Sequence, residues 1–555
     1  MSRRRFLKTI GTGFLAGPWL GSLASHSLKA DWIVPSPAGR KKRRLLSNHD
    51  GAIMSMQPPL TAEHFRKVVR TYQGTPVDTI CFCLGGREVY HHDTKVAEVF
   101  GRRHGTFKNA DHWRVYENTR LLIESGKGPL ATFVDVCHQE GMDIFASFRM
   151  NSHYVTDPQS PSHSDFRVKH PEWLIGHPKG YSKGSKEFGI RMGLNYGIPA
   201  VRKHMEATIV EAFERFQVDG VELDFMRHPA FFKLHEAREN HHHMTDMLRQ
   251  IKRERDRVSK ATGRSIDLAM RVPPSFAGAL RVGLDVRTWI QEGLVDILIA
   301  GGGFIPFDMP FDEFVRAARG TNCRVFGGME LLRFMTGRTP DLDVNRAIAM
   351  RFWKGGADGL QLFNYFAQPT DWKQRFFKEI GDPDRLAHLD KRYQMDFRRY
   401  PAGGWTGHAA AFSAAIPAVQ LPVTITETPS GRGPRLHLRV SDDLSSAKSK
   451  GILAKTQLRL LFDKYTSQDK IEVHLNGEQL PENRSAPYDL STWWNKGRGP
   501  YQGKYLEGTL EYDVGCPPLR EGDNVIDIRL VKRTANLDAP LRLELVEASI
   551  TYDSG

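Results

Sequence analysis

The chain has 555 residues, which is more than one average domain contains and indicates at least two domains. Hydrophobic residues make up 40% and charged residues 26%, as in an ordinary soluble globular protein. The net charge of +14 is moderate, and no basic run is interleaved with aromatic residues on a recognisable module. These features exclude a nucleic-acid-binding protein, and we expect the positive surplus to favour acidic substrates such as uronate- or sulfate-bearing glycans.

The first 30 residues have the features of an export signal. SRRRFLK (2–8) precedes an uncharged, Gly-rich stretch, and small residues continue to Ala30. This order resembles the twin-arginine signal, which implies that the twin-arginine translocase carries the folded protein into the periplasm or out of the cell. The alternative is a disordered basic tail. Cleavage after Ala30 removes five cations and leaves +9, and no later apolar run approaches the ~18–20 residues of a membrane helix, so we expect no stable membrane insertion.

Short apolar runs alternate with helical patterns through most of the remaining chain. Continuous apolar strands between helices are typical of parallel strands that are buried on both faces. Helical periodicity is clear in 199–217, 240–262 and 343–354. We therefore predict a (β/α)8 TIM barrel within 31–400, with an open doubly wound sheet as the alternative. The eight predicted strands are 44–51, 78–85, 143–151, 220–226, 266–273, 296–302, 323–330 and 359–365.

Two regions interrupt or follow this pattern. The connection 152–198 is unusually long, which is typical of a functional loop, and its Trp173 and Tyr181 could stack on a sugar ring or pin their own loop. A small-residue linker is predicted at 401–422. From 423 to 555, runs of alternating polarity separated by turn signals predict an antiparallel β-sandwich, with a hairpin at Asn476-Gly477.

The fourth predicted strand carries two carboxylates in the sequence VDGVELDFMRHP (218–229). Residues two apart on a strand share a face, so Glu222 and Asp224 point into the barrel while Val221 and Leu223 face the helices. A buried carboxylate without a partner is costly, which indicates that each has a task or a partner. Asp224 should lie at the mouth, where barrel enzymes place their active sites, and Glu222 one layer deeper, where it tunes Asp224 by like-charge coupling.

This stretch resembles the fourth strand of glycosidase barrels. The closest resemblance is to the glycosyl-hydrolase-like, family 10-like barrels, in which a D-G-x-x-x-D strand follows a helix preceded by x-P-x-V-R, here residues 198–202. The stretch is also similar to the α-amylase superfamily, whose nucleophilic Asp is followed four residues later by His, as Asp224 is by His228. The amylase pattern has Arg where this chain has Glu222. The resemblance covers roughly 40–400 and implies a glycoside hydrolase that needs no cofactor. The run LREGDNVIDIRL (519–530) resembles sandwich modules of carbohydrate-active enzymes.

Glycoside hydrolysis generally requires two carboxyl groups across the scissile bond. Asp224 is the first candidate, as nucleophile or base, and Glu330, at the end of the seventh strand, is the second, as general acid; the two roles are interchangeable. The alternative for Glu330 is a helix cap, and Asp308 and Asp312 are reserve acids. The predicted substrate-binding residues lie at strand ends or in the long connection: His49, Asp50, Arg149, Asn151, Trp173, Arg227, His228, Arg271, Asn364 and Tyr365.

Two other functions remain open. A metal-dependent hydrolase would draw its ligands from His49, Asp50, His91, His92, Asp93, Asp224 and His228, although the sequence has no H-E-x-x-H motif. A non-catalytic glycan-binding barrel would keep the cleft without the acid. No flavin, nucleotide, haem or cluster motif supports an oxidoreductase, and we predict neither a metal nor a cofactor.

Overall fold

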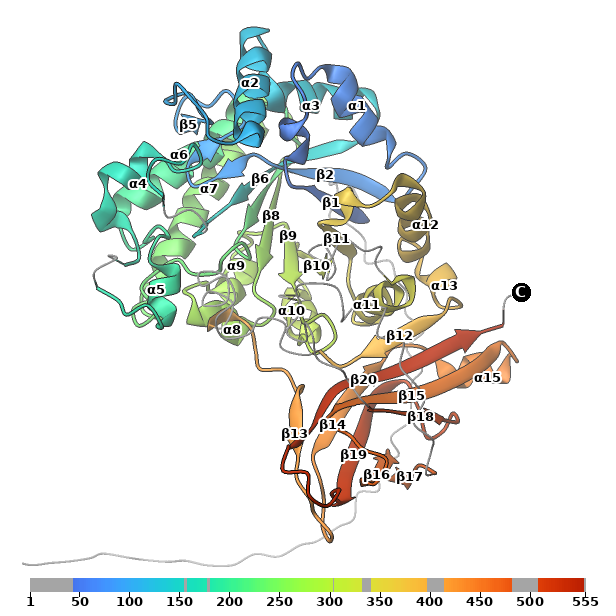
Figure 1. The fold of residues 1–555 in the computed structure, drawn as a ribbon. Helices are drawn as coiled ribbons and strands as arrows, with labels where there is room; N and C mark the ends of the chain where they lie inside the picture. The colour runs from blue at the N-terminus through green and yellow to red at the C-terminus, as the bar shows by residue number, and fades with distance from the viewer. Residues whose placement is uncertain are drawn as a thin grey trace, which may run out of the picture. The chain divides into compact units, whose positions relative to one another are not determined.

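A computed structural model describes residues 43–153, 157–176, 180–302, 304–331, 341–396, 414–481 and 508–553. The predicted export signal and most of the predicted linker lie outside these residues. Figure 1 shows the barrel strands with helices around them, and the C-terminal strands gathered in separate sheets. The predicted fold class, a TIM barrel followed by an antiparallel β-sandwich, is confirmed.

Eight parallel strands form a closed barrel in the order β1-β2-β6-β7-β8-β9-β10-β11, with β11 hydrogen-bonded to β1. Each lies within two residues of a strand predicted from the sequence. The strands are β1 (Leu45–His49), β2 (Val77–Cys83), β6 (Asp143–Arg149), β7 (Gly220–Asp224), β8 (Asp267–Val272), β9 (Ile297–Gly301), β10 (Arg324–Glu330) and β11 (Gly359–Phe363).

Helices of the barrel units connect these strands. The main ones are α1 (Ala62–Arg70), α2 (Ala110–Glu124), α3 (Gly128–Gln139), α6 (Pro199–Arg215), α7 (His241–Thr262), α8 (Phe276–Arg281), α9 (Val286–Gln291), α10 (Phe311–Ala318), α11 (Leu342–Lys354), α12 (Thr370–Ile380) and α13 (Pro383–Leu386). The sequence explains their ends: Pro199 occupies the first turn of α6, and Gly263 ends α7 in the left-handed conformation at φ 71°. Their apolar faces pack on the outer sides of the strands, where most of the core lies.

The long connections at the carboxyl ends of β2 and β6 contain short elements. The first contains β3 (Gly85–Gly86), β4 (Val89–Tyr90) and β5 (Glu98–Val99), which form a small sheet. The second contains α4 (Asp165–Lys169), the 3₁₀ helix η2 (Pro171–Trp173) and α5 (Lys186–Ile190). Two further 3₁₀ turns, η1 (Ala52–Ser55) and η4 (Tyr365–Ala367), follow β1 and β11.

The barrel interior is layered from one end to the other. At the amino ends of the strands, Arg43 binds Asp143 and Asp267. Above them lies a separate apolar cluster of side chains that point inward: Leu46, Cys81, Phe145, Ala269, Ile297, Ile299 and Phe326. Polar and charged side chains follow toward the carboxyl ends, and this upper layer holds the candidate site.

The C-terminal region forms two antiparallel sheets. One has the order β12-β20-β15-β18 with β13 beside β20, and the other has the order β14-β19-β16-β17. The hairpin predicted at Asn476-Gly477 joins β16 to β17, and both residues have positive φ. β12 lies within the predicted barrel segment, yet it pairs with β20. The elements are β12 (Lys391–Gln394), β13 (Val423–Ile425), β14 (Arg435–Val440), α15 (Leu444–Ser449), β15 (Leu453–Asp463), β16 (Lys470–Leu475), β17 (Glu478–Gln479), β18 (Gly508–Asp513), β19 (Gly522–Lys532) and β20 (Leu541–Tyr552).

Candidate active site

Both carboxylates of β7 are buried, and they face the barrel interior. Val221 and Leu223 pack in the outer core, so the alternation of the strand turns Glu222 and Asp224 inward. In the strand register, Glu222 lies beside Ala269 of β8, which belongs to the inner apolar cluster. Asp224 lies one layer higher, at the carboxyl end of the strand.

Arg271 of β8 joins Asp224 to Glu330. Its Nη1 donates to Asp224 Oδ1 at 2.8 Å, and its Nη2 donates to Glu330 Oε1. All three side chains are at most 4% exposed. Burial opposes the charge on Arg271, but the neighbouring carboxylates raise the pKa of its guanidinium, so this group carries a full positive charge.

This bridge limits the separation of the two carboxyl groups. A guanidinium and two hydrogen bonds span on the order of 8 Å at most. That distance is compatible with the ~5–5.5 Å of retaining and with part of the ~6.5–9.5 Å range of inverting glycosidases. The Phe363 ring of β11 lies 4.0 Å from the Arg271 guanidinium carbon and supports one face of the group.

Glu330 ends β10 and has a second partner in the loop after β9. The backbone N–H of Phe304 donates to Glu330 Oε2 at 2.6 Å. Met226 packs closely against the end of β9, since a Cβ on Gly301 would lie 2.6 Å from its Cγ. The alternative prediction, that Glu330 caps a following helix, concerns residues 332–340, which lie outside the described residues.

The carboxyl group of Glu222 has a strongly perturbed pKa. Burial and the charge of Asp224 raise its pKa to about 7, against the opposing effects of Ser147, Arg271 and Gln361. Gln361 of β11 donates to Glu222 Oε1 at 3.2 Å across the barrel. Sequence reasoning missed Gln361 and Ser147, which the alternation of β11 and β6 could have indicated as inward-facing polar residues.

A second ion pair, between Arg149 and Asp50, lies beside the Asp224–Arg271–Glu330 group and is more exposed than that group. Arg149, at the end of β6, donates to Asp50 Oδ1 at 2.6 Å, and Asn48 donates to the same oxygen at 3.3 Å. Burial would raise the pKa of Asp50, but Arg149 and Arg227 lower it to about 2. The side chains of Arg149 and Asp50 are 17% and 21% exposed.

Two of the other predicted substrate-binding residues face the helices. His49 packs against Phe82, Phe133 and Phe366, and burial lowers its pKa to about 4. Tyr365 is buried, stacks on Trp372 and donates to Asn345. Asn364 has a left-handed backbone and donates its N–H to Asn48 Oδ1 at 2.9 Å.

The remaining predicted residues support loops above the barrel. Asn151 is buried and donates to the carbonyls of Leu194 and Ala230. His228 has a φ of 62°, and its Nδ1 accepts from the backbone N–H of His153. Trp173 stacks on His170 with ring centroids 3.5 Å apart, so it packs within its own loop.

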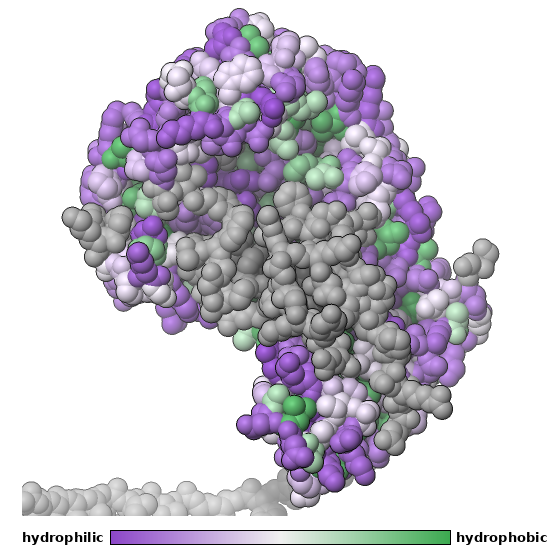
Figure 2. All heavy atoms as spheres, in the orientation of Figure 1, coloured by the Kyte–Doolittle hydropathy of each residue, from purple (hydrophilic) through white to green (hydrophobic). Residues whose placement is uncertain are grey.

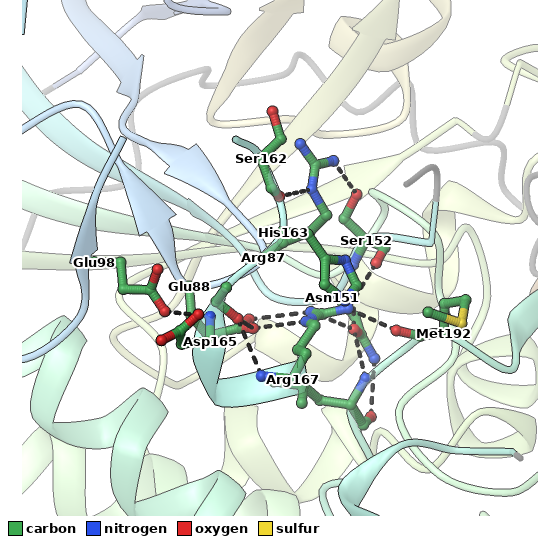
Figure 3. A network of polar contacts seen from close by, with 12 residues as sticks. Arg87, Glu88, Glu98, Asn151, Ser152, Ser162, His163, Asp165, Arg167 and Met192 are labelled. Atoms are coloured by element: carbon green, nitrogen blue, oxygen red, sulfur yellow. Dashed lines mark hydrogen bonds and ion pairs between the residues drawn. The ribbon is translucent and has the colours of Figure 1, made fainter. Parts of the chain in front are cut away.

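The loops after β2 and β6 are joined by a buried ion pair, shown in Figure 3. Arg167 of α4 binds Glu88 in bidentate fashion, at 2.6 and 3.0 Å, and both side chains are almost fully buried. Arg167 also donates to the carbonyls of Ser152 and Met192, and Ser164 donates to Glu88. This network fixes the position of the long connection beside the mouth, and sequence reasoning did not identify it.

The reserve acids lie toward the C-terminal region. Asp308 is near Gln420, and burial raises its pKa to about 6, while Asp312 accepts from Arg439 of β14. Of the alternative metal ligands, His92 is buried and His91 is half-buried, and desolvation lowers their pKa values to about 4 and 3, while Asp93 binds Lys95. In the described ranges, no group of three or more His, Cys, Asp or Glu side chains is arranged to hold a metal ion.

Figure 2 shows a hollow in the region where Figure 1 places β2 and β6, with hydrophilic residues at its floor. Among the helices that the structure describes, none has the length and apolar character needed to cross a membrane. An eight-stranded parallel barrel with acids and arginines gathered at the carboxyl ends of its strands has the arrangement in which barrel enzymes build their active sites.

Residues 107–246 match the family described as glycosyl hydrolase-like 10. The predicted resemblance to the glycosyl-hydrolase-like barrels is confirmed over this segment, which contains Arg149, Glu222 and Asp224. No curated protein matches the sequence.

Several solved structures are similar to the chain at low identity. The GH36 α-galactosidase AgaA of Geobacillus stearothermophilus is 11% identical with a TM-score of 0.36, and the match covers 88% of this chain and 56% of that one. The PgaB (BpsB) glycoside hydrolase domain of Bordetella bronchiseptica is 10% identical with a TM-score of 0.39, covering 62% and 98%. The maltogenic α-amylase AmyB of Thermotoga neapolitana is 12% identical with a TM-score of 0.32, covering 58% and 68%. The chain thus spans little more than half the length of the galactosidase.

Proposed function

We propose that the protein is an exported glycoside hydrolase that cleaves a poly- or oligosaccharide between Asp224 and Glu330. The observation that carries this proposal is the convergence of these carboxyl groups on one guanidinium, from strands that two other strands separate. In this arrangement Asp224 is the nucleophile or base and Glu330 the general acid, or the roles are exchanged.

Arg271 must move before the reaction, because it lies between the two carboxyl groups. A sugar that displaces this guanidinium leaves a buried carboxyl group without its cation, and such a group binds a proton more readily. Substrate binding would thereby create the proton donor that glycoside cleavage needs. Glu222, one layer below, limits how much negative charge the site holds.

The test is a screen of the mature protein on neutral and acidic polysaccharides, measured by released reducing ends. Asp224→Asn and Glu330→Gln should each lower turnover by a factor of about 10²–10⁴. Asp308→Asn is the matched control, because Asp308 is a partly buried acid whose side chain accepts from Gln420. Full turnover in both Asp224→Asn and Glu330→Gln contradicts the proposal, whereas loss in Asp308→Asn alone would identify that residue as the acid.

A non-catalytic glycan-binding barrel is the second candidate, and Arg271 is the observation that favours it. A guanidinium that binds both carboxylates stabilises them as a structural ion cluster. Glycan binding without product release, unchanged by Asp224→Asn, would support this function over hydrolysis.

We also propose that the twin-arginine translocase exports the protein to the periplasm or beyond. The supporting observation is the SRRRFLK sequence, with Arg3 and Arg4 at the paired positions. Replacing both arginines with lysine should retain the full-length precursor in the cytoplasm, as detected by cell fractionation. Normal export of this variant would contradict the proposal.

A further inference from the structure

Arg149 and Asp50 form the charged pair of the mouth that is most open to solvent among those described above. Their side chains are 17% and 21% exposed, whereas Asp224, Arg271 and Glu330 are nearly inaccessible. A ligand that approaches the strand ends therefore meets Arg149 and Asp50 before it reaches the buried carboxyl groups.

The strand register places Arg149 directly beside Asp224. The two residues are partners in the pairing of β6 with β7. Arg149 then extends across the end of β2 to reach Asp50, which follows β1. Gly86 lies under the stem of Arg149, since a Cβ at this glycine would be 3.6 Å from Arg149 Cβ. The aliphatic part of Arg149 thus packs against the backbone of β3.

The field at this position favours negative charge. The pKa of Asp50 indicates this preference. Burial alone would raise the pKa of a carboxyl group, whereas the pKa of Asp50 falls to about 2. Arg149 and Arg227 cause this decrease, so two cations act on one carboxylate. Arg227 belongs to the same mouth, because its backbone N–H donates to Asp224 Oδ1 at 3.2 Å. A ligand anion would be attracted by both guanidinium groups and repelled by Asp50, so we expect it to bind on the side of Arg149 that faces away from Asp50.

We propose that Arg149 and Arg227 form a subsite for an anionic substituent of the sugar, next to Asp224. The substituent is the carboxylate of a uronate or the sulfate of a sulfated sugar, because the planar fork of a guanidinium matches both groups. A guanidinium has five N–H donors, so Arg149 can hold Asp50 and a ligand oxygen together. This subsite rests on the proposed function in that it selects the glycan that the carboxyl pair cleaves.

Calorimetric titration of the intact mature protein tests the subsite without requiring hydrolysis. The probes are D-glucuronate and inorganic sulfate, with D-glucose as the neutral comparison. Both anions should bind at least tenfold more tightly than glucose at low salt, and binding should weaken in high salt. A response to only one anion would distinguish a uronate site from a sulfate site.

Arg149→Gln and Arg227→Gln should each weaken anion binding about tenfold, and Arg149→Lys should restore part of it. Arg66→Gln on α1 is the matched control, because Arg66 pairs with Glu63 away from the mouth, and it should bind as the wild type does. Circular dichroism identifies any variant that fails to fold. If Arg149→Gln does not fold, anion binding by Arg149→Lys is compared with that of the wild type instead.

The outcomes separate this inference from the proposed hydrolase. Anion binding that depends on Arg149, in a protein that cleaves no glycan, leaves the subsite in place and contradicts hydrolysis. Cleavage of a neutral glycan that Arg149→Gln leaves unchanged contradicts the subsite and supports hydrolysis. Equal binding of glucuronate, sulfate and glucose to the wild type also overturns the subsite.

Discussion

Gln361 Nε2 donates a hydrogen bond to Glu222 Oε1 at 3.2 Å, and this contact crosses the barrel interior from β11 to β7. It supplies a polar partner to a carboxyl group that is nearly inaccessible to water. The hydrogen bonds from Gln361 and Ser147 do not replace full hydration, so the protonated form of Glu222 is favoured in the folded protein.

The stability of the protein should therefore depend on Glu222 between pH 4.5 and 7. In this range the folded state retains a proton that the unfolded state has lost, because the pKa of Glu222 rises from 4.5 to about 7 on folding. The free energy of unfolding consequently decreases as pH rises, by up to about 3 kcal/mol.

Glu222→Gln removes this dependence and should gain stability relative to the wild type above pH 7. Urea unfolding at several pH values measures the difference. Glu544, whose pKa is also raised to about 7, and Asp308 are present in both proteins, so their effects cancel in the comparison. Parallel pH profiles for variant and wild type would show that Glu222 is ionised throughout.

Arg271→Met should destabilise the barrel by about 3–5 kcal/mol at neutral pH, because it leaves two buried carboxylates without their cation. Arg271→Lys should restore only part of this loss, since an ammonium group lacks the fork that bridges Asp224 and Glu330. Chemical denaturation measures both variants.

The exposed Arg257 of α7 provides the control for this prediction, and Arg257→Gln should change stability by no more than about 0.5 kcal/mol. Adding Glu330→Gln to Arg271→Met should recover part of the lost stability, because one uncompensated charge is removed. Arg271→Met with wild-type stability at neutral pH would show that the bridge has no energetic role.

The barrel could be predicted in detail because its strands are continuous apolar runs with helices between them. The facing direction of Glu222 and Asp224 could also be predicted, since strand alternation depends only on sequence spacing. A position at the end of a strand does not by itself predict that a side chain faces the mouth, and His49 is an example. It follows the inward-facing Asn48 by one residue, so its ring packs outward against Phe82 and Phe133.

Partners across the barrel could not be predicted from spacing. Arg271 was expected at the mouth, but its role as a bridge depends on the register of β7, β8 and β10. The Glu88–Arg167 pair joins residues 79 apart in the connections after β2 and β6, and neither strand alternation nor helical periodicity predicts a contact between them.

That ion pair should control the stability of the long connection after β6. Glu88→Gln weakens a bidentate contact that is closed to solvent, so the backbone around residues 151–153 and 164–168 should open more readily, at a free energy lower by about 3 kcal/mol. Hydrogen exchange measured by mass spectrometry would show faster exchange in these peptides and unchanged exchange in the barrel strands. Glu117→Gln on the surface of α2 is the control, and equal exchange in the two variants would contradict the prediction.

Arg43 should stabilise the barrel without affecting the mouth. It binds Asp267 at 2.8 Å and Thr79 at 2.8 Å, contacts Asp143, and lies at the amino ends of the strands, with the inner apolar cluster between it and the acids above. Arg43→Met removes the cation that Asp143 and Asp267 share, although Arg324 stays 3.2 Å from Asp267, and should lower the free energy of unfolding by about 3 kcal/mol. Glycan binding or cleavage per folded molecule should remain at the wild-type level, because barrel sites lie at the carboxyl ends of the strands. Urea denaturation combined with a titration of active molecules measures both quantities, and a large loss of binding in fully folded Arg43→Met would show that the two ends of the barrel are coupled.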